Sequence, residues 1–248
     1  MITETDGIIL RQTSIANDRK MIVLLTRKFG KISAGTGIRV SGKRSSLPLR
    51  AFTHGRYMLF AGRQTYNIDS AEVIESFYEI GRNPDSFFCA SYVLEFTDRI
   101  LPENVPDEQI LDTLTGMLRI LCKRKTRLRS LLIMYQWKIL SITGYMPGLD
   151  VCVKCGNPEE QSGLSVVDGG VICSRCRDSG SVNMRLLYDL EFDIIPILKF
   201  IQKNEIAAFS KLAFSDDTAD YLDRILRSYL SYHLDIRDLR SNSYITFD

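Results

Sequence analysis

Short runs of apolar residues separated by polar turns dominate the first eighty residues of the chain. The runs fall at 7–11, 21–26, 32–34, 52–60 and 65–78, and a segment rich in Gly, Ser and basic residues occupies 35–46. Apolar runs of this length, bounded by turn residues and without a helical period, predict strands. The pattern therefore predicts about five strands in this part of the chain.

The number and spacing of these strands narrow the fold. Five short strands with one polar insertion between the third and the fourth are typical of a small closed barrel of the OB-fold type. An SH3-like barrel is the alternative. We expect an OB-fold domain over residues 1–80.

The period of the pattern changes at residue 83. Apolar residues now recur three and four positions apart, which predicts helices. Asn83-Pro84-Asp85 is a helix start, because Asn caps, Pro fits the first turn and an acid suits the helix dipole. Further helices are predicted from about Pro106, from Leu128 to Gly144, in a segment that Asn183 caps and Pro196 kinks or divides, and from about Asp217 to Tyr232. Cys89 and Cys122 fall on or beside apolar stripes and are predicted to be structural thiols.

Two Cys-x-x-Cys pairs, Cys152/Cys155 and Cys173/Cys176, are separated by 17 residues. Each pair folds into a knuckle whose two sulfurs converge, so the four thiolates can bind one tetrahedral Zn²⁺. Alternating apolar residues around Gly169-Gly170 predict a β-hairpin that brings the second knuckle back to the first. We expect a zinc ribbon, at about 148–180, with one structural Zn²⁺ per chain.

Other uses of these four cysteines fit the sequence less well. Disulfides are disfavoured because no signal peptide precedes the chain, which favours a reducing cytoplasm. Redox catalysis needs one Cys-x-x-Cys at the start of a helix. A catalytic zinc usually has a His ligand with an acid beside it, whereas His54 and His233 are distant in sequence from the pairs. The expected fold is thus α+β: an N-terminal OB-fold barrel and an α-helical domain over 81–248 with the inserted zinc ribbon.

Charge is distributed unevenly along the chain, although the net formal charge is only +2. Residues 1–66 contain 12 Lys or Arg and three acids, whereas residues 82–118 contain two Arg and seven acids. A concentrated positive patch on a small domain attracts polyanions, and an acidic remainder limits indiscriminate binding. We therefore predict that the two parts face different partners, with nucleic acid bound by the first.

Basic residues of the barrel and of one helix end are the predicted DNA contacts. Three glycines and three unpaired basic residues in the 35–46 segment allow it to fold onto phosphates. The run at 123–129 either caps the preceding helix in solvent or makes a second phosphate contact. Whether the barrel aromatics Tyr57, Phe60 or Tyr66 stack on bases is left open, because strand aromatics more often pack in cores. The predicted DNA-binding residues are Arg19, Lys20, Arg27, Lys31, Arg39, Lys43, Arg44, Arg56, Lys123, Arg124, Lys125 and Arg127.

Over nearly its whole length the chain resembles RecO, a family of bacterial DNA repair proteins. The most specific match is Leu-Ser-Ile-Thr-Gly-Tyr-Met-Pro at 140–147, which runs into Cys-Val-Lys-Cys-Gly at 152–156. The stretches at 7–10, 26–31, 37–44, 92–103, 232–234 and 239–241 are similar to the family as well. The resemblance implies an OB-fold, a helical domain and a zinc module that acts as a structural support.

The same resemblance implies a function. RecO proteins bind single- and double-stranded DNA, anneal complementary strands and help load RecA onto DNA coated with single-stranded DNA-binding protein. The implied partners are DNA, RecR and single-stranded DNA-binding protein, with RecA and RecF linked indirectly. The implied location is the cytoplasm, at the nucleoid.

Two other classes of function compete with this one. A zinc-ribbon adaptor in transcription or RNA handling would share the basic barrel and the cysteines. An enzyme such as a hydrolase or a deaminase is disfavoured, because His54 has no motif partner and no His-x-Glu lies beside the cysteine pairs. We therefore expect no catalytic residues.

Overall fold

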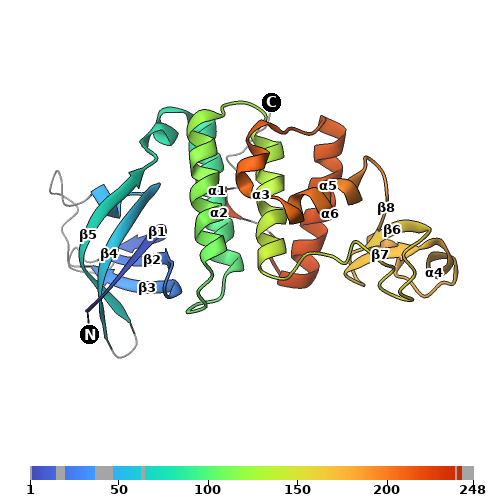
Figure 1. Ribbon diagram of the computed structural model, residues 1–248, viewed down its shortest axis with the longest axis horizontal. Coiled ribbons are helices and arrows are strands. Elements are labelled where there is room, and N and C mark those ends of the chain that lie inside the picture. The colour runs from blue at the N-terminus through green and yellow to red at the C-terminus, as the bar shows by residue number, and fades with distance from the viewer. Residues whose placement is uncertain (1, 15–19, 37–46, 63–64, 238, 242–248) are drawn as a thin grey trace. The chain divides into compact units, whose positions relative to one another are not determined.

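The computed structural model describes residues 2–14, 20–36, 47–62, 65–237 and 239–241 (Figure 1). The chain forms two compact units, one comprising 1–128 with 239–248 and the other 129–238. The first two long helices therefore belong to the same unit as the N-terminal strands, whereas the predicted domain division falls at about residue 80. That predicted boundary stays a prediction, and each unit is described by itself below.

Five strands in the first unit pair into a closed barrel in the order β1-β2-β3-β5-β4. β3 and β5 run parallel over three residue pairs, and the other four pairings are antiparallel. The short 3₁₀ helix η1 (Leu47–Leu49) lies in the connection from β3 to β4. The strands are β1 (Ile2–Ser14), β2 (Lys20–Thr26), β3 (Gly30–Thr36), β4 (Thr53–Ala61) and β5 (Tyr66–Ser76).

Alternate residues of the strands point inward and fill the barrel. The buried cluster comprises Ile9, Ile22, Leu24, Ile32, Ala34, Leu49, Tyr57, Leu59 and Ile68. Gly30 begins β3 at φ 66°, and a Cβ there would lie 2.1 Å from the carbonyl oxygen of Val105. Glycine is therefore required on both counts, and its absence of a side chain lets the Glu103–Val105 segment lie directly on β3. The Asn104 N–H donates to the Lys31 carbonyl at 2.8 Å in this contact.

Helices α1 (Pro84–Ile100) and α2 (Glu108–Lys123) follow a 3₁₀ turn, η2 (Tyr78–Arg82). The predicted cap is confirmed, because the Asn83 side chain accepts a hydrogen bond from the Ser86 N–H at 2.8 Å. The predicted stripe from Cys89 to Ile100 is buried, as is the Leu111–Leu121 stripe of α2. Burial raises the pKa of the Cys89 thiol to about 12, so this thiol is unreactive, as expected of a core residue.

A segment from beyond the second unit returns to α1. The Glu95 carboxylate accepts hydrogen bonds from the N–H groups of Arg240 and Ser241, both at 2.9 Å, and from the Ser241 hydroxyl at 2.7 Å. Leu239 and Ser241 are buried there. These contacts explain why residues 239–241 group with the first unit.

The second unit contains α3 from residue 129 onward, α5 and α6, together with a small sheet. The helices are α3 (Leu128–Ile142), α4 (Ser174–Asp178), α5 (Ile194–Lys203) and α6 (Asp216–Leu234), and the strands are β6 (Gln161–Ser165), β7 (Gly170–Cys173) and β8 (Leu187–Asp189). Apolar residues at helical spacing bury one face of each long helix, and Ile142 at the end of α3 is half-buried. The buried residues are Leu128, Leu132, Tyr135 and Ile139 of α3 and Leu222, Ile225, Leu226 and Tyr229 of α6. Trp137 is fully buried, with its ring 5.9 Å from that of Tyr229.

One predicted helix in this unit is wrong. Asn183 caps a single 3₁₀ turn, η3 (Met184–Leu186), and the next three residues form β8. Leu187 packs over Gly163 of β6, where a Cβ would lie 2.8 Å from the Leu187 Cδ1. Pro196 lies in the first turn of α5, where its missing N–H costs nothing, so it neither kinks nor divides that helix.

Candidate metal centre and nucleic-acid surface

The segment before the first cysteine pair is fastened to the small sheet by its backbone. The Gly148 N–H donates to Gly169 at 2.9 Å, and the Gly148 carbonyl accepts from Val171 at 2.8 Å. The approach is close enough that a Cβ on Gly170 would lie 2.6 Å from the Gly148 oxygen. A further bond, from the Val153 N–H to the Val171 carbonyl at 2.9 Å, places the first knuckle beside β7. Glycine at these positions thus brings the two cysteine pairs together.

The four predicted ligands meet at one point. The Sγ atoms of Cys152, Cys155, Cys173 and Cys176 all lie within 4.8 Å of one another. The Cys155 and Cys173 sulfurs are 3.7 Å apart. A tetrahedral zinc with Zn–S bonds of about 2.3 Å requires sulfurs roughly 3.8 Å apart. The cluster therefore has the dimensions of a four-thiolate metal site.

The four sulfur donor atoms restrict which metal ions this site can bind. Four thiolates in this arrangement suit Zn²⁺ or an iron–sulfur centre far better than Mg²⁺ or Ca²⁺, which take oxygen ligands. Cys152 and Cys173 are buried, Cys176 is half-buried and Cys155 is exposed. Four protein ligands fill a tetrahedral shell, which is the arrangement of structural sites and leaves no position for a substrate.

The environment favours the thiolate form at two of the four cysteines, Cys152 and Cys155. Burial opposes ionisation of Cys152, but hydrogen bonds from the backbone N–H groups of Cys173, Cys155 and Lys154 lower the pKa of its thiol to about 6. The hydrogen bond of Arg175 with Cys155 raises the pKa of the guanidinium, so a cation lies at the exposed ligand. Lys154 pairs with Asp168 at 2.6 Å in the turn between β6 and β7. A metal ligand must be deprotonated, and these groups favour that form at Cys152 and Cys155, whereas the hydrogen bond with Cys155 raises the pKa of the Cys176 thiol.

The second cysteine pair begins a short helix, because Cys173 is the N-cap of α4. Redox cysteines occupy this position in other proteins, and the residue pattern did not predict a helix here. The helix has only five residues, however. The Sγ atoms of Cys173 and Cys176 both lie within 4.8 Å of the sulfurs of the first pair. All six cysteines are free thiols in the structure, and the convergence of four of them favours metal binding over disulfide exchange.

Four of the predicted DNA contacts, Arg19, Arg39, Lys43 and Arg44, lie outside the described residues. Lys20 begins β2 and is within 3.4 Å of the Gln12 side-chain oxygen. Arg56 of β4 is about half exposed and lies 3.6 Å from Glu4, which is a loose surface pair. Both side chains are accessible, and their contact with DNA stays a prediction.

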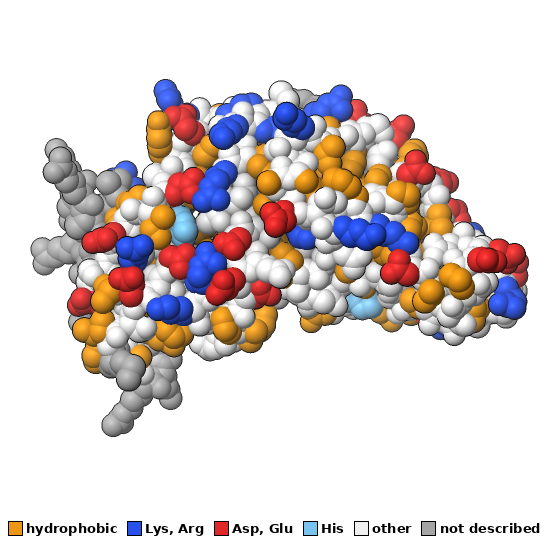
Figure 2. Space-filling model, viewed as in Figure 1, with side chains coloured by type: hydrophobic (Ala, Val, Ile, Leu, Met, Phe, Trp, Pro, Cys, Tyr) orange, Lys and Arg blue, Asp and Glu red, His pale blue; other side chains and the backbone are white. Residues whose placement is uncertain are grey.

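Arg27 and Lys31 are engaged within the first unit. Arg27 lies 3.2 Å from Asp6 and 2.8 Å from Asp112 of α2. The Lys31 Nζ donates to the Asp98 backbone carbonyl at 2.6 Å and lies 3.4 Å from its carboxylate. The acidic helices therefore neutralise part of the basic barrel, which the sequence did not indicate. Figure 2 shows the result, with Lys and Arg interspersed among Asp and Glu over this unit.

The basic run after α2 satisfies backbone carbonyls. The Lys125 ammonium donates to the carbonyl of Leu121 at 3.0 Å, as a C-terminal cap does. Arg124 donates to the carbonyls of Thr126 and Arg127 at 3.0 and 2.8 Å. Lys123 and Arg127 are exposed. Only Lys125 binds a carbonyl within α2, so the capping interpretation accounts for one of the four residues, and phosphate contact stays a prediction for all of them.

The three barrel aromatics considered for base stacking differ clearly in how exposed their rings are. Tyr57 is fully buried, and its hydroxyl donates to the Pro48 carbonyl at 2.9 Å, so its ring is unavailable to a base. Tyr66 is half-buried with its ring 5.4 Å from that of Phe29. Phe60 is 49% exposed on β4. Phe60 is therefore the most accessible of the three.

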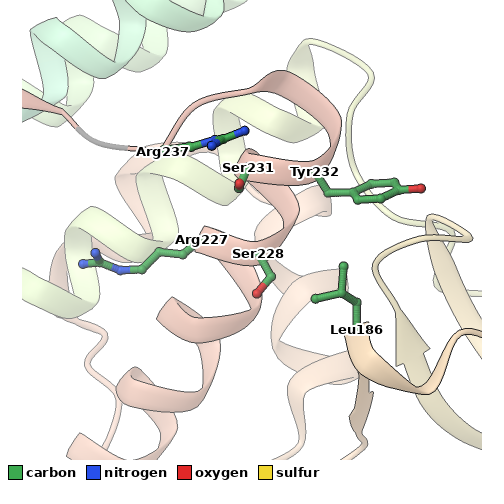
Figure 3. A pocket seen from close by; sticks show the side chains of 6 residues that line it. All are labelled: Leu186, Arg227, Ser228, Ser231, Tyr232 and Arg237. Carbon is green, nitrogen blue, oxygen red and sulfur yellow. The ribbon is translucent and has the colours of Figure 1, made fainter.

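Two groups of residues were missed by the sequence reasoning. The Glu95 carboxylate that binds residues 240 and 241 is one, and its partners are 145 residues away or more. The other is an open pocket in the second unit, lined by Leu186, Arg227, Ser228, Ser231, Tyr232 and Arg237 (Figure 3). The exposed Arg227 and Tyr232, five positions apart near the end of α6, were the available signal.

Membrane insertion by a helix finds no support, since none among the described residues combines the length and apolar character that a bilayer span requires.

Two family profiles cover the chain. The one described as Recombination protein O N terminal matches residues 1–77, and the one described as Recombination protein O C terminal matches residues 82–243.

Curated relatives agree over the full length. The DNA repair protein RecO of Thermoanaerobacter sp. (strain X514) is 29% identical over 98% of this chain and 97% of its own length. That of Symbiobacterium thermophilum is 29% identical over 97% of this chain and 95% of its own length. The protein of the same name from Alkaliphilus metalliredigens is 26% identical over 95% of both chains. The chain belongs to the RecO family of DNA repair proteins.

Proposed function

We propose that this protein is a recombination mediator that binds single- and double-stranded DNA and anneals complementary strands. In this role it helps load RecA onto DNA coated with single-stranded DNA-binding protein. The closed five-stranded barrel at the head of a RecO-family chain is the observation that carries the proposal. We assign the barrel to the OB-fold, because its strand order and single long β3–β4 connection match that architecture.

The mechanism relies on charge and involves no covalent step. Lys and Arg side chains on the barrel neutralise phosphates on two strands and release counterions, which lowers the repulsion that slows annealing. Lys20 and Arg56 are accessible for this role among the described residues. Arg39, Lys43 and Arg44 supply the remaining charge in the proposal. Arg27 and Lys31 rank lower as contacts, because they already hold ion pairs with Asp112 and Asp98.

We assign the four-cysteine cluster to one structural Zn²⁺ in a zinc ribbon. Cys152, Cys155, Cys173 and Cys176 would hold the ion, and its contribution is to fix the two knuckles against the hairpin. The closed set of four ligands supports a structural role. We therefore propose that the protein is not an enzyme.

The proposed partners follow from family membership. They are DNA, RecR and single-stranded DNA-binding protein, with RecA and RecF acting in the same process. The proposed place of action is the nucleoid in the cytoplasm.

Annealing tests the proposal directly. Two complementary oligonucleotides are coated with single-stranded DNA-binding protein of the same organism, and duplex formation is followed by fluorescence quenching with and without this protein. Acceleration at catalytic or stoichiometric protein concentrations is the expected result. No acceleration, with folding and metal content verified, would reject the mediator function and favour a nucleic-acid adaptor.

Removal of positive charges then tests which residues contact the DNA. Replacing Arg39, Lys43 and Arg44 together by Ala should lower the slope of log affinity against log salt by roughly two for single-stranded DNA, at about 0.7 per lost phosphate contact. The matched control replaces three exposed basic residues of the second unit, Lys203, Lys211 and Arg224. An unchanged slope in the first variant would remove that segment from the site.

A further inference from the structure

The open pocket of the second unit has a volume of about 600 Å³, within the range of small-ligand sites. Four of its six lining residues, Arg227, Ser228, Ser231 and Tyr232, come from the last turns of α6. Leu186 of η3 and Arg237, which follows α6, complete it (Figure 3). Among the described residues, its lining contains two cations, two hydroxyls and a tyrosine, and no acid.

Helical geometry explains how these side chains gather. Residues 227 and 231, and likewise 228 and 232, are four positions apart, and the two pairs are adjacent, so all four lie on one side of α6. The opposite face, with Leu222, Ile225 and Leu226, is buried in the unit. At the end of the helix Asp235 adopts φ 51°, and the Ile236 N–H returns to the Leu230 carbonyl at 3.2 Å. This reversal brings Arg237 to the rim of the pocket.

The two arginines retain free hydrogen-bonding edges. Arg227 uses its Nε to bind Asp223 at 2.8 Å, and Arg237 uses its Nε to bind Asp235 at 3.2 Å. Within the described part of the chain, the terminal guanidinium nitrogens of both have no recorded partner. Ser231 likewise makes no recorded hydrogen bond there, whereas Ser228 contacts the Tyr188 hydroxyl at 2.5 Å. Terminal guanidinium nitrogens are the groups that bind phosphate oxygens.

Tyr232 supplies an open aromatic surface in the same pocket, at the opposite edge of this side of α6 from Arg227 (Figure 3). Its side chain is 52% exposed, and the His233 ring contacts it edge-on at 5.0 Å between centroids. In Figure 3 the Tyr232 ring projects from α6 on the same side as Leu186. An exposed ring beside guanidinium groups is the combination by which proteins bind unpaired bases and their backbone.

We propose that this pocket binds nucleotides of single-stranded nucleic acid. A base stacks on Tyr232, and phosphates of other nucleotides of the same strand, which runs across α6, bind Arg227 and Arg237. The lining offers only Leu186 and Tyr232 as apolar contacts, so it provides an open stacking face and lacks an enclosed socket for an apolar peptide anchor. The inference rests on the proposed function, because annealing requires two strands to be held at once and this pocket gives one of them a contact beyond the barrel.

Photo-crosslinking of the full-length protein tests the stacking. Oligothymidylate containing 5-iodouracil is irradiated with the protein, and the attached residue is identified by mass spectrometry. Crosslinks at Tyr232 are expected. Tyr232→Ala should abolish them, whereas Tyr232→Phe should keep them because the ring is retained.

Charge removal tests the phosphate contacts. Arg227→Ala with Arg237→Ala should reduce the crosslink at Tyr232 about tenfold and lower the salt slope for oligothymidylate by roughly 1.4, at about 0.7 per contact. Arg224→Ala is the matched control, since Arg224 lies on the same helix against the Tyr221 ring and outside the pocket. All the altered side chains are exposed or at the rim, and equal thermal midpoints verify folding.

The outcomes separate this inference from the proposed function. Annealing that is retained without any crosslink at Tyr232, or with salt slopes unchanged by the two Arg substitutions, would overturn the inference alone. If the unaltered protein binds no DNA, the proposed function is overturned. Binding of an acidic peptide that depends on Arg227 and Arg237, with no crosslink to the oligonucleotide, would assign the pocket to a protein partner and also overturn the inference.

Discussion

The barrel and the four-cysteine module are both small β structures, but they differ greatly in how much apolar surface they bury. The barrel encloses nine buried residues in one cluster, among them Tyr57 and Leu59. The module's cluster has four, and two of these are Cys152 and Cys173. Leu149, Leu164, Val166 and Val171 of the module are also buried, but outside this cluster, so the two cysteine knuckles have little apolar burial of their own to offset the conformational entropy of ordering them. The barrel is therefore stable through apolar burial, whereas we expect the two cysteine knuckles to depend on the metal that we assign to them.

Metal removal should give the largest effect. Chelation, or Cys176→Ser, is expected to unfold the module, because thiolate binding of a structural zinc contributes roughly 10–16 kcal/mol at neutral pH. Hydrogen exchange would show loss of amide protection over 148–182, with protection of the barrel strands retained. Cys122→Ser is the control, since Cys122 lies outside the cluster. A module that keeps its protection in verified metal-free protein would contradict the comparison.

Truncation inside the barrel should be the next largest effect. Leu59 is fully buried in the barrel cluster, so Leu59→Ala should lower the free energy of unfolding of this unit by about 2–5 kcal/mol. Phe60→Ala, at the adjacent and exposed position, should cost less than about 0.5 kcal/mol. Urea titrations followed by barrel-specific exchange would measure both. Equal losses in the two variants would mean that the barrel is not held by its interior.

An ion pair links the barrel to its neighbouring helix and limits how self-sufficient the barrel is. The Lys31 and Asp98 side chains are 11% and 14% exposed, so Asp98→Asn leaves a largely buried ammonium without a counter-charge. We expect a loss of about 2–3 kcal/mol, less than for a fully buried pair because Lys31 keeps its bond to the Asp98 carbonyl. Asp112→Asn, in the exposed pair with Arg27, should cost no more than about 1 kcal/mol. Denaturant midpoints of the two variants give the comparison.

The smallest expected effect concerns the Glu95 contact and depends on pH. Burial of Glu95 opposes ionisation, but the bonds from Ser241 and Arg240 keep the pKa of its carboxyl below the ordinary value. The stabilisation is therefore complete above the unfolded pKa of roughly 4.3 and is lost as the pH falls through the lower folded pKa. Glu95→Gln should cost about 1 kcal/mol at pH 7 and little at acid pH.

Exchange of the Arg240 and Ser241 amides measures this contact directly, because both donate to Glu95. In the unaltered protein their protection should decline as the solution is acidified below about pH 4, beyond the intrinsic pH dependence of exchange. Glu95→Gln should remove that extra dependence. If both proteins show the same pH profile, the carboxylate does not hold this segment.

The predictable parts of this fold are those with local causes. Asn83 before Pro84 predicts a helix start because the cap bond joins residues three apart, and the structure has that bond. Two Cys-x-x-Cys pairs predict convergent sulfurs because each knuckle is formed within four residues. Helical stripes such as Leu111 to Leu121 are likewise visible in the sequence and buried in the structure.

The parts that escaped prediction have distant causes. Leu187, Leu190 and Ile194 have helical spacing, yet residues 187–189 form a strand because β6 offers a ladder and Gly163 offers space. Arg27 and Lys31 look like free cations in the sequence, and their partners Asp112 and Asp98 are 85 and 67 residues away. The pocket on α6 needed the chain reversal after Asp235 before Arg237 could join it.

The Glu95 contact also orders events during protein synthesis. The barrel, α1 and α2 leave the ribosome first, and the whole of the second unit follows before Arg240, 145 residues after Glu95, becomes available. Throughout that interval the N-terminal unit exists without residues 239–241. The Glu95 carboxylate therefore lacks the N–H and hydroxyl donors of Arg240 and Ser241. The first unit therefore reaches its final structure only after the second unit has been synthesised. Its last step is the binding of residues 240 and 241 by Glu95.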